Sequence, residues 1–128
     1  MSEEKYEEAL ETLWGSIQIL LSIFGPIHKD IAFCYSKIAN IYYKLGDMNQ
    51  TILNHQQCVR ILEKFYGFDN PQTAHAYSSL SLFYYTAKET EKAFAAQLKS
   101  LYIFNLIGGE FVKSLLGKFL LTFDLLAS

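Results

Sequence analysis

The side chains here that suit metal binding or nucleophilic catalysis are three histidines, His28, His55 and His75, and two cysteines, Cys34 and Cys58. A metal site on a helix needs ligands four residues apart on one face, and no two of the histidines have this spacing. His55 and Cys58 are three residues apart and can share a helix face, but a zinc site takes three or four ligands. The cysteines have no CxxC spacing and are too few for a disulfide framework, which favours reduced thiols. We therefore expect packing roles for the His55–Cys58 pair, and no catalytic residue, metal site or cofactor.

Phosphate and nucleic acid have no evident binding motif in the sequence. The pair Gly108-Gly109 lacks the context of a phosphate-binding loop and is better interpreted as a helix stop. The formal net charge of −2 gives no general attraction for polyanions. Aromatic side chains beside Lys37, Lys44 and Arg60 offer stacking platforms for single-stranded RNA, but the basic residues are dispersed and five glutamates near the start oppose them. Direct RNA binding therefore stays a disfavoured alternative.

Composition and the first residues indicate a soluble, cytoplasmic protein. Hydrophobic residues make up 51% of the 128 positions and charged residues 19%, which is enough apolar matter for a single domain over residues 1–128. The first eight residues contain four glutamates and one lysine, whereas a secretory signal begins with a basic segment. The longest apolar stretches, 17–24 and 119–126, are interrupted by polar residues and are far shorter than the roughly 20 residues of a membrane-spanning helix. We expect no membrane insertion.

The elements that position these side chains follow a repeated pattern. Gly25 and Gly67 are 42 positions apart, and Tyr6, Met48 and Thr90 extend the same offset to three copies. Further pairs at this offset are Ala32 and Ala74, Tyr35 and Tyr77, Tyr42 and Tyr84, and Tyr43 and Tyr85. A fixed period in this range is typical of a stack of repeated units.

Each copy holds two helices, because its apolar residues follow helical spacing and its turns carry helix stops. Gly46-Asp47 turns the chain between helices, Gly67 ends one, and Asp69-Asn70-Pro71 begins the next. The pattern predicts helices over residues 3–23, 29–44, 47–65, 71–86, 89–107 and 110–126. The first of these is a second-type helix with no partner before it. The predicted fold is therefore all-α, with about two and a half helical hairpins.

Small and aromatic residues recur at fixed places in each hairpin, and this arrangement resembles the tetratricopeptide repeat. In one copy the places hold Ala39, Tyr42, Leu45-Gly46-Asp47, Thr51 and Cys58, and in the next Ser81, Tyr84, Ala93 and Ser100. Small side chains let two helices cross closely, while tyrosine fills the space between hairpins. The resemblance implies a right-handed stack of antiparallel helical hairpins that acts as a scaffold for protein partners.

The long period narrows the resemblance, because the commonest repeat of this class has about 34 residues. The junction at 66–77 is similar to that of kinesin light chain repeats. The chain looks more like the repeat region of the clustered mitochondria protein family, in segments 24–32, 42–47 and 55–67. Two residues depart from the pattern of the family. Lys29 stands where the family usually has a proline, and Lys88 stands where the first copy has the turn glycine, Gly46. The resemblance implies a module of a larger cytosolic protein involved in mitochondrial distribution or associated with translation initiation factor 3. A kinesin light chain-like cargo adaptor is the alternative.

The surface best suited to a protein or peptide partner is the concave side, which the first helix of each hairpin lines. One helical phase turns polar and aromatic side chains toward this groove in both copies. The predicted groove residues are Phe33, Lys37, Asn40, Tyr43, Lys44, His75, Ser78, Ser79, Leu82 and Tyr85. The amide and the lysines suit the main chain or a carboxylate of an extended peptide, and the tyrosines suit apolar side chains. The alternative is a face that merely keeps the protein soluble.

The helices predicted at the two ends of the chain have surfaces that we expect another protein surface to cover. The last predicted helix, 110–126, is apolar nearly all round, whereas terminal repeats normally need a polar outer face. The first, 3–23, has no first-type partner. We expect a second copy of the chain or the remainder of a larger protein to cover these ends, and a homodimer is preferred. The residues predicted for this surface are Trp14, Phe111, Leu115, Leu116, Phe119, Leu120 and Phe123.

Overall fold

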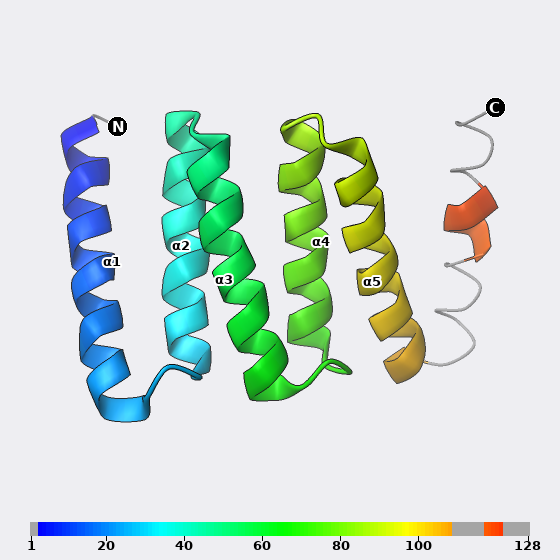
Figure 1. The fold of residues 1–128 in the computed structure, drawn as a ribbon, viewed down its shortest axis with the longest axis horizontal. Coiled ribbons are helices and arrows are strands. Elements are labelled where there is room, and N and C mark those ends of the chain that lie inside the picture. The colour runs from blue at the N-terminus through cyan, green and yellow to red at the C-terminus, as the bar shows by residue number, and fades with distance from the viewer. Residues whose placement is uncertain (1–2, 109–116, 122–128) are drawn as a thin grey trace.

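The chain folds into a row of helices that run alternately up and down (Figure 1). The computed structural model describes residues 3–108 and 117–121. Its helices are α1 (Glu3–Phe24), α2 (Lys29–Leu45), α3 (Met48–Tyr66), α4 (Pro71–Thr86) and α5 (Thr90–Gly108). In the row, α2 pairs with α3 and α4 pairs with α5, while α1 stands beside α2 (Figure 1). The predicted all-α class of stacked helical hairpins is confirmed for this part of the chain.

The helices begin and end within one residue of the predicted bounds from α1 to α5. Residues 117–121 are also helical, and the rest of the predicted helix 110–126 lies outside the described residues. None of the described helices is long and apolar enough to cross a bilayer.

Side chains that cap the first turn fix where α3 and α4 begin. The carboxylate of Asp47 accepts a hydrogen bond from the amide of Gln50 at 3.1 Å, and the Asn70 side chain accepts one from the amide of Gln72 at 2.8 Å. Each bond satisfies a main-chain donor that has no partner within the helix. Pro71 follows at the first helical position of α4, where its missing N–H removes no bond.

The turn inside each hairpin depends on one residue in the left-handed conformation. In the first hairpin this residue is Gly46, with φ of 84°, and in the second the equivalent residue is Lys88, with φ of 65°. A side chain in this conformation costs about 1–2 kcal/mol relative to the right-handed region. Both turns nevertheless make the same main-chain bonds, which run back to the carbonyls of Tyr42 and Tyr43 and of Tyr84 and Tyr85. The departure at Lys88 therefore adds strain without changing the turn.

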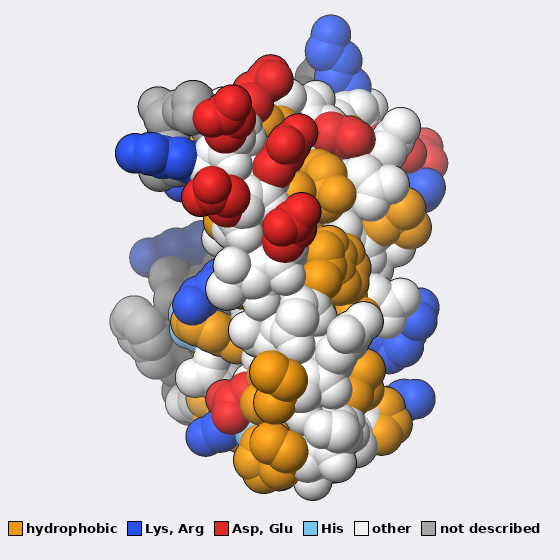
Figure 2. Space-filling model, turned by 90° about the vertical axis from the view of Figure 1, so that its left-hand side faces the viewer, with side chains coloured by type: hydrophobic (Ala, Val, Ile, Leu, Met, Phe, Trp, Pro, Cys, Tyr) orange, Lys and Arg blue, Asp and Glu red, His pale blue; other side chains and the backbone are white. Residues whose placement is uncertain are grey.

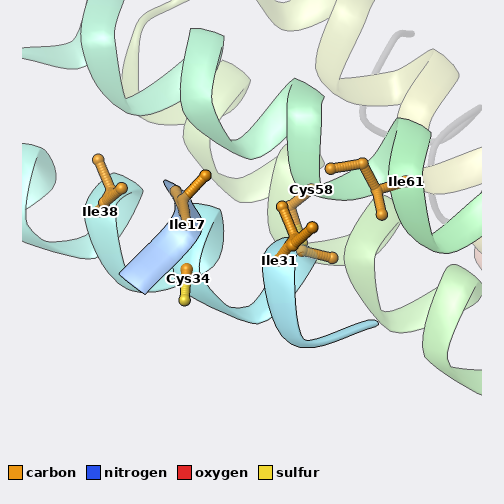
Figure 3. Packing of buried hydrophobic residues seen from close by; sticks show 7 residues of the cluster. Ile17, Ile31, Cys34, Ile38, Cys58 and Ile61 are labelled. Carbon is orange, nitrogen blue, oxygen red and sulfur yellow. The ribbon is translucent and has the colours of Figure 1, made fainter. Parts of the chain in front are cut away.

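Two buried clusters fill the space between the helices. In the first, Ile17 from α1, Ile31 from α2 and Cys58 and Ile61 from α3 meet (Figure 3). The second joins α3, α4 and α5, and its buried members are Val59, Ala74, Ala76, Tyr77, Leu80 and Ile103. Leu62 packs against both clusters. Each large aliphatic side chain buried in this way contributes roughly 1.5–3 kcal/mol, so the continuous core holds α2 and α4 at a fixed separation.

Small residues occupy the closest helix contacts, as the repeat pattern requires. Ala39 and Thr51 are fully buried in the first hairpin, and Ser100 is buried in the second. The Ser100 hydroxyl donates to the carbonyl of Ala74 at 2.8 Å, which joins α5 directly to α4. Close packing of this kind leaves one face of α2 and α4 free of the core.

Candidate partner-binding groove

A cavity of about 490 Å³ lies between α2 and α4, with α3 side chains in its lining. Three of the predicted groove residues, Phe33, His75 and Ser79, line it. Because Phe33 comes from α2 and the other two from α4, the structure brings together residues that are more than 40 positions apart in the sequence. The volume is within the range of about 300–1,000 Å³ that is usual for ligand sites.

A second cavity, of about 420 Å³, lies between α1 and α2. Ile19 and Leu20 from α1 line it together with Cys34. Asp30 and Phe33 line both cavities, so the Phe33 ring separates two hollows on neighbouring parts of the surface. The hollowed surface therefore continues past α2 onto α1, where none of the predicted groove residues lies.

The predicted groove side chains are mostly exposed. Phe33 is 61% exposed and Tyr85 is 68% exposed, which are large fractions for aromatic residues. Ser78 differs from the others: it is half-buried, and its hydroxyl lies 3.2 Å from the Gln97 side-chain oxygen of α5, to which it donates. The remaining predicted residues that are exposed are Lys37, Asn40, Tyr43, Lys44, His75, Ser79 and Leu82. These residues are open to a partner, although only some of them border the cavity.

Contacts within the protein hold two of the exposed rings in place. The Lys37 ammonium lies 4.6 Å from the centre of the Phe33 ring, one helical turn away on α2. The ring of Tyr43 lies 5.6 Å from that of Phe83 on α4. Such contacts limit the motion of the two rings.

His55 and Cys58 of α3 both line the 490 Å³ cavity and are both buried. The His55 Nε2 atom lies 2.9 Å from the carbonyl oxygen of Ala76. Burial lowers the pKa of the His55 imidazole, and it raises the pKa of the Cys58 thiol to about 12. At neutral pH the pair therefore presents a neutral imidazole and a protonated thiol, and a protonated thiol is not the nucleophilic form. Within the part of the chain that the structure describes, no three histidine, cysteine or carboxylate side chains gather in a metal-binding group.

Sequence reasoning missed several residues of the cavity. Lys29 and Asp30 lie at the start of α2, Tyr66 ends α3, and Gln72 lies in the first turn of α4. They lie nearer the helix ends than the predicted groove residues do, so the predicted groove does not include them. His55 was assigned to packing, although its place on the buried stripe of α3, between a small threonine and a cysteine, is a signal that a polar ring faces the neighbouring hairpin.

The three described residues among those predicted for a covered surface, Trp14, Phe119 and Leu120, lie at opposite ends of the row. Trp14 of α1 is 39% exposed, and its ring packs edge-on against Tyr35 at 5.9 Å. The outer face of α1 carries acidic side chains at one end and apolar ones at the other (Figure 2). Phe119 is half-buried and stacks on Phe94 of α5, and Leu120 is 40% exposed. The other residues predicted for this surface lie outside the described residues, namely Phe111, Leu115, Leu116 and Phe123.

Comparison with known proteins adds a family and a fold. The sequence model of a family described as tetratricopeptide repeat matches residues 30–105. A clustered mitochondria protein of Arabidopsis thaliana is 32% identical over 93 residues, which are 73% of this chain and 7% of that protein. The human clustered mitochondria protein homolog is 23% identical over 104 residues, which are 81% of this chain and 8% of that protein. The chain thus spans less than a tenth of these relatives.

One solved structure resembles the fold without close sequence similarity. The crystal structure of BtubC (BKLC) from P. vanneervenii superposes with a TM-score of 0.70 at 16% sequence identity. The similarity covers 78% of this chain and 39% of the other. At this identity the likeness supports the arrangement of helices alone.

Proposed function

The chain belongs to the tetratricopeptide repeat family, and from this premise we propose that it is a non-enzymatic scaffold that holds an extended segment of a partner protein. The segment lies across α2 and α4, on the face that carries the predicted groove residues. Repeats of this family act as interaction surfaces, and their extended faces suit long, narrow partners. The proposal assigns binding to the face and assigns no chemistry to it.

The observation that carries the proposal is the recurrence of exposed polar and aromatic side chains on both first-type helices beside a cavity. Asn40 offers an amide that can donate to and accept from a peptide main chain, and Lys37 and Lys44 suit carboxylates. Tyr85 offers a large exposed ring, and rings of this type contribute strongly to binding energy when they are buried by a partner. A face that only needed to stay soluble has no need of so much exposed aromatic area.

The similarity to clustered mitochondria proteins supports a proposal about where the scaffold acts. We propose that it serves a cytoplasmic assembly connected with mitochondrial distribution or translation initiation. The partner would then be another protein of that assembly, bound by this module. A second copy of the chain, or the remainder of a larger protein, would cover the apolar ends of the row.

The test uses two groove substitutions and a matched control on the other type of helix. Asn40→Ala combined with Tyr85→Ala removes an amide and a ring from the groove. Asn49→Ala combined with Tyr102→Ala removes the same two residue types from exposed positions on α3 and α5. Proteins retained by the wild-type chain from a cell lysate are quantified for each variant by mass spectrometry. The specific partners are expected to be lost with the groove variant and kept with the control, whereas equal recovery with all three chains would move binding off the groove.

A further inference from the structure

We propose that copies of this chain assemble end to end, so that the helical segment 117–121 of one copy packs on α1 of the next. This contact supplies the wall that the hollow between α1 and α2 lacks. The inference rests on the self-association in the proposed function and deepens it, because it names the two faces that meet and the binding site that they complete.

One face of α1 is open where the same face of α3 and of α5 is covered. At the 42-residue offset, Ile19 of α1 corresponds to Ile61 of α3 and Ile103 of α5. Ile61 is 7% exposed and Ile103 is fully buried, whereas Ile19 is 62% exposed. Ile61 belongs to the buried cluster that joins α3 to α2, so the first-type helix of its own hairpin covers it. No such helix lies beside α1 among the described residues, and its aliphatic side chain stays in water.

The rest of this face carries the small side chains of a helix contact. We define the open face of α1 as Ala9, Thr12, Ser16 and Ile19. The places of the three small residues are held by Thr51, Asn54 and Cys58 in α3 and by Ala93, Ala96 and Ser100 in α5. All six of these equivalents are buried, whereas Thr12 is exposed and the other two small residues of α1 are half-buried. The open face thus repeats the pattern of two surfaces that already pack on a first-type helix of this chain.

The hollow between α1 and α2 repeats the cavity between α2 and α4, but it lacks one wall. Five of its six lining residues hold places that also line the larger cavity, one repeat further on. The pairs are Ser16 and Cys58, Leu20 and Leu62, Asp30 and Gln72, Phe33 and His75, and Cys34 and Ala76. In the larger cavity α2 adds a wall that contains Phe33 and Ser36. The hollow has no counterpart of this wall in the described part of the chain, so the site on α1 is incomplete.

Residues 117–121, at the other end of the row, have the phase of a first-type helix. They are helical, and a shift of 42 positions places them on α4. Phe119 takes the place of Tyr77 and stacks on Phe94 of α5, with 6.4 Å between centroids. One repeat earlier, Ile52 holds the place of Phe94 and packs on the cluster that contains Tyr77. The segment therefore contacts α5 as α4 contacts α3.

The outward side of this segment fits the open face of α1. Leu120 takes the place of Ser78, whose hydroxyl donates to Gln97 and so joins α4 to the second-type helix of its hairpin. At the same offset Gln97 corresponds to Leu13 of α1, so both members of the polar pair become leucine together. Leu120 is 40% exposed, and it also holds the place of Ser36 in the missing wall. An apolar contact between Leu120 of one copy and Leu13 of the next therefore replaces the polar one.

The two faces lie at opposite ends of the row, so one copy cannot bring them together (Figure 1). A second copy continues the row, because its α1 pairs with segment 117–121 of the first as a second-type helix pairs with a first-type helix. A dimer is the first product. It leaves one face open at each end, so further copies add as the concentration rises.

The test blocks each face separately and then mixes the two variants. Ile19→Glu places a charge on the open face of α1, and Leu120→Glu places one on segment 117–121. Leu53→Glu is the matched control, because Leu53 of α3 is 54% exposed and the residues at its place in the other repeats, Glu11 and Ala95, are exposed too. Size-exclusion chromatography with light scattering measures the assembly of each chain, and circular dichroism checks that it folds.

The wild-type chain and the control are expected to form dimers at micromolar concentration and larger species above it. Each blocked variant should need a concentration at least about tenfold higher, because it loses the burial of an aliphatic side chain. An equimolar mixture of the two blocked variants should form a dimer and nothing larger, since each keeps the face that the other has lost. If Leu120→Glu does not fold, Leu120→Ala takes its place in the mixture.

Three results would overturn the proposal: a monomeric wild-type chain, a blocked variant that assembles like the wild type, or a mixture that stays monomeric. A contact between two identical faces gives the second and third of these. The groove variant described above should lose the lysate partners but keep the assembly, whereas Leu120→Glu should lose the assembly and keep those partners. Failure of the end-to-end contact is thereby distinguished from failure of groove binding.

Discussion

Lowering the pH below about 6.5 is expected to destabilise the folded chain through His55. The imidazole is buried between α3 and α4, and loss of hydration lowers its pKa from the ordinary value of 6.5. The hydrogen bond to the Ala76 carbonyl acts in the opposite direction but is the smaller effect. The folded chain therefore resists taking up a proton that the unfolded chain accepts readily.

The direction and size of the effect follow from this difference. Because the folded pKa lies below the unfolded one, the contribution of His55 to stability is fully present above pH 6.5 and is lost as the pH falls toward the folded pKa. One proton changes the free energy of unfolding by at most about 1.4 kcal/mol per pH unit. Between pH 7 and 5.5 the loss therefore reaches at most about 1.3 kcal/mol. The Cys58 thiol in the same cavity, with a pKa of about 12, stays neutral throughout this range.

The assay is urea unfolding, followed by circular dichroism at several pH values between 7.5 and 5.5. His55→Gln is the control variant, because its amide retains a donor for the Ala76 carbonyl and does not titrate. The wild-type chain should lose more stability than the variant as the pH falls, and the difference isolates His55 from every other titrating group. Parallel losses in the two chains would refute the assignment of the acid sensitivity to this ring.

Two further predictions concern the turns and the ends of the chain. Lys88→Gly should raise the free energy of unfolding by about 0.5–1 kcal/mol, because relief of the left-handed strain exceeds the added chain entropy, and Gly46→Ala should lower it by about 1 kcal/mol. Thermal or urea unfolding measures both, and a loss of stability in Lys88→Gly would contradict the strain argument. Size-exclusion chromatography with light scattering should show a dimer at micromolar concentration, and a clean monomer would contradict the proposed self-association.

The arrangement of helices was predictable because local signals and the repeat agree. Gly46, Asp47 and Pro71 are helix stops or starts by their own chemistry, and the 42-residue offset places the same signals in the next copy. Each turn therefore has a cause within a few residues of the chain. Phe33 and Tyr85, two of the predicted groove residues, are both exposed in the structure.

The pairing of His55, which lines the cavity between α2 and α4, was not predictable from the same signals. His55 lies on an apolar face of a second-type helix, where the spacing alone does not show what its polar ring pairs with. In the structure its Nε2 atom meets the carbonyl of Ala76 on the next hairpin, 21 positions away. That contact depends on how α3 and α4 cross, so the spacing of residues within either helix does not predict it.

The position of α1 gives the proposed groove a direction. α1 is a second-type helix that stands beside α2 without a first-type helix before it, so its Ile19 and Leu20 line the hollow on that side. A segment that crosses Phe33 therefore passes from a hollow that α1 lines with Ser16, Ile19 and Leu20 to one whose lining contains the imidazole of His55. Because Ile19 and Leu20 line only the first hollow and His55 and His75 line only the second, a bound segment in the reverse orientation would meet different side chains at each end. The groove would thus select the direction of its partner as well as its sequence.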